Sequence, residues 1–268
     1  MRATSPANPS SGTSDVSAAA VEFRGVSFRH SDGTPVLDGL TLAVAPGEVV
    51  ALLGRSGAGK STVLRLVNRM LRPTGGEVFV DGRNTQVWDP IALRRRIGYV
   101  LQDGGLFPHM TVADNVAVVP RLEGWPAADV EARVREMLAL VDLPSPRYGA
   151  RWPAELSGGE RQRVGVARAL AADPPVLLMD EPFGSLDPIT RAELQQETAR
   201  LQQRLRKTIL LVTHDVEEAL LLGDRICILD DGRLQACVDA AAFDESDDPV
   251  IVALRDARLR RPAPARES

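Results

Sequence analysis

Short apolar runs alternate with stretches of helical periodicity along most of the chain. Residues 176–179, 209–212 and 226–229 are continuously apolar, which is typical of parallel strands buried on both faces. Two other stretches carry apolar residues every three or four positions. They comprise Val130, Val134, Met137, Leu138 and Val141, and Leu194, Thr198, Leu201 and Leu205. The alternation predicts helices that pack on a mostly parallel sheet, which is an α/β fold.

The first part of the chain has a different pattern. Residues 21–28, 40–44 and 77–80 are predicted strands, and Asp32-Gly33 and Asp81-Gly82 supply turns near them. Short strands connected in this way favour antiparallel pairing. We therefore expect a small antiparallel sheet beside the mostly parallel one.

Length and composition limit the possible functions. A chain of 268 residues can hold one large domain or two small ones. A net charge of −4 and a pI near 5.5 argue against a nucleic-acid-binding surface, which is usually basic. The two cysteines, Cys227 and Cys237, indicate no disulfide framework and fit a reducing cytosol. No apolar run reaches the ~20 residues that span a bilayer, and residues 1–20 lack a signal-peptide centre and are expected to be a disordered tail.

A phosphate-binding loop is the strongest local signal. Residues 54–61 read GRSGAGKS and match G-x-x-x-x-G-K-[ST] at every fixed position. A predicted short buried strand at 48–53 precedes the loop. After the loop, helical spacing is shown by Val63, Leu64, Val67, Met70 and Leu71. The residues expected to contact a nucleotide here are Gly54, Ser56, Gly57, Gly59, Lys60, Ser61 and Thr62. This strand–loop–helix order predicts that backbone N–H groups and the helix N-terminus bind phosphate oxygens.

Two side chains of this loop have specific tasks. Lys60 is expected to reach the β- and γ-phosphates, and the Ser61 hydroxyl to bind Mg²⁺. The chain has only one other lysine, Lys207, and arginine supplies the remaining positive charge. A lysine at position 60 fits the need for a compact charge on a flexible stem. For Lys207 we expect only a solvated helix end.

A pair of carboxylates follows the predicted strand at 176–179. In P-loop nucleotidases an aspartate at such a strand end holds Mg²⁺, so Asp180 is the expected metal ligand. Glu181 is then placed to polarise an attacking water as a general base. Adjacent carboxylates also occur as ordinary surface residues, but the phosphate loop earlier in the chain favours the metal and base assignment.

Further motifs resemble those of ATP-binding cassette (ABC) proteins, in the same order along the chain. Residues 156–163 read LSGGERQR and closely resemble the signature motif of that family. Gln102 matches the Q-loop glutamine, residues 185–187 (SLD) match the D-loop, and His214 matches the switch histidine. The resemblance runs from about residue 21 to 238. It implies a P-loop RecA-like core with a mostly parallel sheet, an N-terminal antiparallel β subdomain and an inserted helical subdomain.

The resemblance also implies a mechanism and partners. Two ATP-binding subunits pack head to tail, so that ATP on the Lys60 loop of one subunit meets the signature residues of the other. Those residues are Ser157, Gly158 and Gly159. Glu181 would deprotonate the water, His214 would contact the γ-phosphate, and Gln102 would touch the metal and the water. Residues 21–240 would form the nucleotide-binding domain, with the helical subdomain at about 103–172, and residues 241–268 would form a short, partly disordered C-terminal extension.

The residue that stacks on adenine departs from the family pattern. Most relatives carry an aromatic residue after the first strand, and the alignment places His30 there. Imidazole can stack on a base, though less well than Tyr. Phe28 could do so only with a shifted register, and otherwise belongs to the core.

Within the family, the chain is similar to ATP-binding subunits of bacterial importers for quaternary amines such as glycine betaine, choline and carnitine. The segments that carry this likeness are residues 66–70 (LVNRM), 97–102 (IGYVLQ), 105–112 (GLFPHMTV), 115–116 (NV), 121–122 (RL) and 179–184 (MDEPFG). It implies transmembrane permease subunits as partners, an indirect link to a solute-binding protein, no nucleic acid, and a peripheral position on the cytoplasmic face of the membrane. Other importers, exporters and soluble ABC ATPases are the alternatives. The short distance from Gln102 to Leu156 leaves no room for the coiled coils of repair ATPases.

Overall fold

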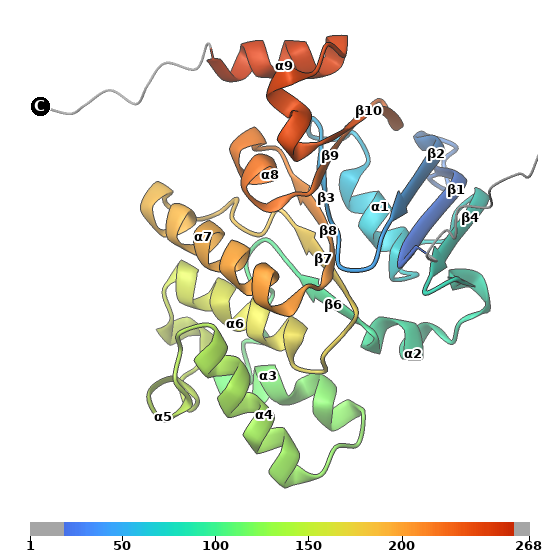
Figure 1. Ribbon diagram of the computed structural model, residues 1–268. Coiled ribbons are helices and arrows are strands. Elements are labelled where there is room, and N and C mark those ends of the chain that lie inside the picture. Colours follow the sequence, from blue (N-terminus) through green and yellow to red (C-terminus); the bar gives the residue numbers. More distant parts are fainter. Residues whose placement is uncertain (1–18, 260–268) are drawn as a thin grey trace, which may run out of the picture.

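The computed structural model describes residues 19–259 and contains two sheets with helices around them (Figure 1). The tail expected at residues 1–20 lies outside this range except for its last two residues. Helices pack against one face of the larger sheet, and the smaller sheet lies toward its other face (Figure 1). This arrangement confirms the α/β prediction.

The larger sheet has the strand order β10-β9-β3-β8-β7-β6. Its strands are β3 (Val49–Leu53), β6 (Ile97–Val100), β7 (Val176–Asp180), β8 (Thr208–Thr213), β9 (Arg225–Asp230) and β10 (Arg233–Asp239). All pairs are parallel except β9 with β10. Every residue of β3 and β8 is buried, because both faces of the sheet are covered, and this explains their continuous apolar runs. The edge strand β10, which alternates between exposed and half-buried residues, was not predicted.

The smaller sheet is antiparallel, with the order β2-β1-β4-β5, as expected from the sequence. Its strands are β1 (Val21–Arg29), β2 (Pro35–Val44), β4 (Gly75–Val80) and β5 (Arg83–Asn84). One buried cluster joins its inner face to helix α1 (Lys60–Val67) and to the larger sheet, as shown by Phe23, Leu64 and Leu210. Helix α1, which follows the phosphate loop, is therefore fixed between the two sheets.

The helices lie mainly on the opposite face of the larger sheet. They include α3 (Val112–Leu122), α4 (Ala127–Leu140), α5 (Ser145–Tyr148), α6 (Gly158–Leu170), α7 (Pro188–Leu205) and α8 (Val216–Leu222). The remaining elements are α2 (Pro90–Arg95), α9 (Pro249–Leu259) and the 3-10 turns at Thr85–Val87, Pro153–Glu155 and Ala240–Glu245. Helices α3 to α6 form the lobe at the bottom of Figure 1. Leu138, Val164 and Leu177 join this lobe to the sheet in a second buried cluster.

Two local expectations are wrong. Helix α1 ends at Val67, so Met70 does not continue its apolar stripe and is 57% exposed. The chain turns there because the Asn68 side chain accepts a hydrogen bond from the Met70 N–H and Arg69 adopts a φ of 54°. Lys207 is not simply solvated, because its ammonium donates a hydrogen bond to Asp173 at 2.8 Å and its side chain is only 15% exposed.

The cysteines also differ from expectation. Cys227 on β9 and Cys237 on β10 lie directly opposite each other in the antiparallel register and form a disulfide. The sequence could not show this pairing, because the register depends on the tight turn between the two strands. Further along, the described part of the C-terminal extension is helical, and its Phe243 and Ile251 are fully buried. Among the described residues, no helix has the length and apolar character needed to cross a membrane.

Candidate functional site

The phosphate loop connects the carboxyl end of β3 to the N-terminus of α1. Gly57 and Gly59 have φ values of 84° and 99°, in the left-handed region where glycine has no steric penalty. Gly54 is needed for another reason: a Cβ at this position would lie 2.2 Å from the backbone oxygen of Leu229 on β9. The loop backbone is therefore free to turn its N–H groups toward an anion at the start of α1.

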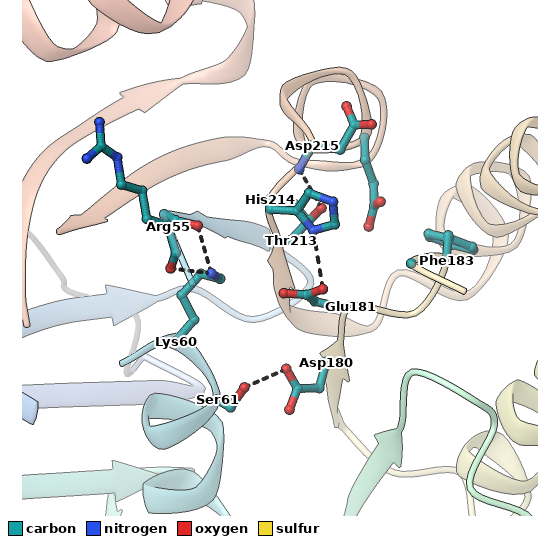
Figure 2. Close-up of polar contacts among 12 residues, drawn as sticks. Arg55, Lys60, Ser61, Asp180, Glu181, Phe183, Thr213, His214 and Asp215 are labelled. Carbon is teal, nitrogen blue, oxygen red and sulfur yellow. Dashed lines mark hydrogen bonds and ion pairs between the residues drawn. The ribbon is translucent and has the colours of Figure 1, made fainter. Parts of the chain in front are cut away.

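Lys60 is the first residue of α1, directly after the loop, and is buried. Its Nζ donates hydrogen bonds to the backbone oxygens of Gly54, at 2.7 Å, and Arg55, at 2.9 Å (Figure 2). Burial lowers the pKa of Lys60, while the nearby Glu181 and Asp180 act in the opposite direction. The ammonium is thus held on neutral carbonyl groups, which phosphate oxygens can replace as acceptors.

Asp180 lies next to Ser61, although 119 residues separate them in the sequence. The Ser61 hydroxyl donates to Asp180 Oδ1 at 2.9 Å (Figure 2). The Tyr99 hydroxyl donates to Asp180 Oδ2 at 3.3 Å, and burial together with the charge of Asp180 raises the pKa of Tyr99 to about 12. No role at the site was predicted for Tyr99, because its position in β6 gives no sign that its hydroxyl reaches Asp180.

Hard oxygen ligands suit Mg²⁺, and the pair formed by Ser61 and Asp180 supplies a hydroxyl and a carboxylate at one point. The described residues contain no group of three or more His, Cys, Asp or Glu side chains arranged to hold a metal. Mg²⁺ usually binds through one or two protein oxygens together with substrate phosphates and water, so the small ligand set fits this ion.

Glu181 and His214 meet across the ends of β7 and β8. His214 Nδ1 is 3.2 Å from Glu181 Oε2 (Figure 2). Glu181 has a φ of 45°, which is unfavourable for a non-glycine residue, and its N–H donates to the backbone oxygen of Val212 at 2.9 Å. The strained backbone places the Glu181 side chain beside the histidine instead of along the direction of β7.

An open cleft of about 620 Å³ collects most of these side chains. It is lined by His30, Thr34, Pro35, Val36, Ser56, Gly57, Gly59, Lys60, Ser61, Thr62, Glu181, Asp231 and Gly232. His30 therefore lies at the cleft, whereas Phe28 is buried in the core and packs its ring edge-on against His30 with centroids 5.5 Å apart. This geometry fits His30, not Phe28, as the residue available to a base in the cleft.

Gln102 follows β6 and lies near the same carboxylate. A Cβ added at Gly184 would lie 3.2 Å from Gln102 Nε2 and 3.6 Å from Glu181 Oε2, so both side chains border this glycine. The Ser185 hydroxyl donates to the Gln102 backbone oxygen at 3.3 Å. The structure thus brings Gln102 and the D-loop residue Ser185 beside Glu181, although Gln102 does not line the cleft.

The signature residues lie elsewhere. Ser157 caps helix α6: its hydroxyl accepts from Glu160 N–H, and the Glu160 carboxylate accepts from Ser157 N–H at 2.8 Å. These hydrogen bonds lower the pKa of Glu160. Ser157 and Gly158 are exposed, whereas Gly159 is buried where a Cβ would lie 2.5 Å from Thr190. None of these residues belongs to the described lining of the cleft, so one chain does not bring its signature to its own phosphate loop.

A family model described as "ABC transporter" matches residues 37–184. The choline transport ATP-binding protein OpuBA of Bacillus subtilis is 51% identical over 209 residues, which are 78% of this chain and 55% of that protein. The chain thus spans about half the length of that relative. The glycine betaine uptake system ATP-binding protein YehX of Escherichia coli is 48% identical, over 80% of this chain and 69% of that protein.

Similar folds are found among solved structures of ATP-binding cassettes. CbiO1 from Clostridium perfringens, part of an ABC transporter complex, is 28% identical and has a TM-score of 0.78, with 91% of this chain and 96% of that chain covered. The ATP-binding cassette MJ0796, solved as a dimer in a post-hydrolysis state with ADP and Pi, is 33% identical with a TM-score of 0.73. That match covers 82% of this chain and 98% of the other.

Proposed function

This chain belongs to the ABC transporter family, and we propose that it is the ATP-hydrolysing subunit of an importer for a quaternary amine. One observation carries the proposal. The ends of three neighbouring strands bring a phosphate-loop lysine, a hydroxyl–carboxylate pair and a glutamate–histidine pair to one place, as seen for Lys60, Asp180 and Glu181 (Figure 2). We assign residues 21–240 to the nucleotide-binding domain, with the helical subdomain at about 103–172.

Substrate binding begins at the phosphate loop. Lys60 exchanges the carbonyl groups of Gly54 and Arg55 for β- and γ-phosphate oxygens, which are stronger acceptors because they are charged. The loop N–H groups and the start of α1 surround the same phosphates. Ser61 and Asp180 would hold Mg²⁺, which neutralises charge that develops on the phosphates during transfer.

Glu181 and His214 act at the γ-phosphate. Glu181 accepts a proton from the attacking water, which makes it the general base. His214 holds the Glu181 carboxylate through the 3.2 Å contact and can reach the γ-phosphate with its other ring nitrogen. Gln102, which follows β6, would contact the same water and ion, and so would couple the site to the segment that follows it.

A second subunit completes the site. Because the signature residues of one chain lie away from its own cleft, the exposed Ser157 and Gly158 must reach ATP from another copy. The N-terminus of α6 would then point its positive end at the γ-phosphate of the partner's ATP. The dimeric state of MJ0796 supports this arrangement. ATP joins the two chains, and its hydrolysis allows them to separate.

The solute and the remaining partners follow from the relatives. Proteins named for choline and glycine betaine transport are 51% and 48% identical to this chain. We therefore infer permease subunits, a solute-binding protein and a peripheral position on the cytoplasmic face of the membrane. The solute itself binds to the partner proteins, where a cage of aromatic faces suits a cation that has no N–H donor.

Two measurements test the proposal. Affinity purification from membranes should recover the chain with permease subunits. Deletion of its gene, in a strain without redundant transporters, should reduce uptake of labelled betaine, choline or carnitine under osmotic stress. Unchanged uptake of all three would refute the solute assignment, whereas the assignment as an ATPase would fail only if the purified complex did not hydrolyse ATP.

A further inference from the structure

The cleft contains a carboxylate that the proposed mechanism does not use. Asp231 is an exposed residue that lines the cleft together with His30, Val36 and Lys60. Glu181 is the other carboxylate of the lining, and it already contacts the ring of His214. Among the described residues Asp231 is thus the carboxylate of the cleft lining that remains for a ligand to contact.

The position of Asp231 is fixed by the turn that carries it. Asp231-Gly232 forms the two-residue connection between β9 and β10, in which Asp230 pairs with Arg233. Both turn residues have positive φ, 44° and 73°, as a type I′ hairpin requires. The Gly232 backbone oxygen accepts from the Asp38 N–H at 2.9 Å, and Arg233 forms an ion pair with Asp38 at 2.5 Å. The turn is thus held against β2 beside the cleft.

Asp-Gly is a favoured pair in such a turn, so the turn explains the residue type, and its place beside the cleft is the further observation. Asp81-Gly82 forms an equivalent turn between β4 and β5, with φ values of 50° and 70°. Asp81 forms an ion pair with Arg96 and does not belong to the described lining of the cleft. Of the two Asp-Gly turns, the one at Asp231 lines the proposed nucleotide site and the one at Asp81 does not.

The layout of the cleft indicates what Asp231 would meet. In the proposed function the phosphates bind at Lys60 and Ser61 and the base binds at His30, so the sugar would lie between these two ends of the cleft, which Asp231 also lines. A ribose offers two adjacent hydroxyl donors, and in dinucleotide-binding folds an acidic residue accepts hydrogen bonds from them. We propose that Asp231 accepts hydrogen bonds from the ribose hydroxyls of bound ATP and selects ribonucleotides over deoxyribonucleotides. This inference rests on the proposed function, because it requires that ATP occupies the cleft.

The test compares binding of ATP and 2′,3′-dideoxy-ATP to the full-length protein by titration calorimetry. Asp231→Gly removes the carboxylate and suits the positive φ, and Asp231→Asn keeps a favoured Asn-Gly turn without the charge. Asp81→Gly is the matched control. The parent and the control should prefer ATP by about 10-fold, the scale of a hydrogen bond to a charged group. In Asp231→Gly this ratio should fall to about 2-fold or less, mainly through weaker ATP binding, with Asp231→Asn between the two.

An ATP preference that is equal in the parent, both Asp231 variants and the control would overturn the inference while leaving the ATPase assignment intact. An equal loss of preference in Asp81→Gly would also overturn it, because the effect would then come from any altered turn. A folded parent that binds neither nucleotide would overturn both this inference and the proposed function.

Discussion

Glu218 is a buried acid on the helix that follows the switch histidine, and its ionisation should make stability depend on pH. It lies on α8 and is 4% exposed. Its Oε2 accepts from Gln195 of α7 at 3.5 Å, whereas Oε1 has no hydrogen-bond partner among the described residues. Burial raises the pKa of Glu218 from 4.5 to about 8; Asp215 adds to this effect, while Thr213, Gln195 and Arg191 oppose it.

The sign and size of the effect follow from linkage. Above pH 4.5 the carboxyl ionises in the unfolded chain, but the folded protein keeps its proton until about pH 8. The stability that the protonated form contributes is therefore lost as pH rises across this window, by ~1.4 kcal/mol per pH unit. The whole interval corresponds to roughly 5 kcal/mol, an upper value because the site can relax and admit water.

Glu218→Gln should remove this dependence, because an amide does not ionise. The free energy of unfolding, measured with urea at constant ionic strength, should rise relative to the parent by about 3 kcal/mol between about pH 5.5 and about pH 8. At the lower pH the variant should be equal to the parent or slightly less stable, because the new amide N–H groups lack a partner. Glu217→Gln removes an exposed carboxylate from the same helix, together with its ion pair to Arg258, and is the control for a carboxylate that is not buried. A constant difference between parent and Glu218→Gln across the range would show that Glu218 is ionised in the folded protein and would refute the reasoning.

Three further predictions concern the ATP site. Glu181→Gln should keep ATP binding, trap an ATP-bound dimer and slow hydrolysis by roughly 10²–10⁴-fold, the scale for loss of a general base; near-normal turnover with the membrane partners present would contradict its role. Lys60→Ala should weaken ATP binding and abolish turnover, and a nucleotide titration with unchanged affinity, together with unchanged turnover, would exclude the assignment. His30→Ala should weaken ATP binding by about 0.5–1.5 kcal/mol while His30→Tyr binds at least as well as the parent. If Phe28→Ala lowers affinity instead in a folded protein, adenine stacks at the other position.

The sequence alone determined the features that depend on local chemistry. The phosphate loop at residues 54–61 was recognisable because only certain residue types can form it, and the structure gives Gly57 and Gly59 the positive φ values that such a loop uses. The central strands were recognisable because burial on both faces requires continuous apolar runs. The order of motifs along the chain was enough to indicate the family. These signals are local in the chain, so no contact between distant residues was needed to read them.

Tertiary structure decided every feature that depends on which distant residues meet. Tyr99 contacts Asp180 only because β6 lies beside β7, and Lys207 has an ion-pair partner only because the fold brings Asp173 to it. Cys227 and Cys237 form a disulfide because the register of β9 and β10 places them opposite each other. The same turn brings Asp231 to the cleft, while the similar turn at Asp81 is not part of it. Identical local sequences therefore take different roles because burial, register and neighbouring charge are set by the whole fold and not by the segment itself.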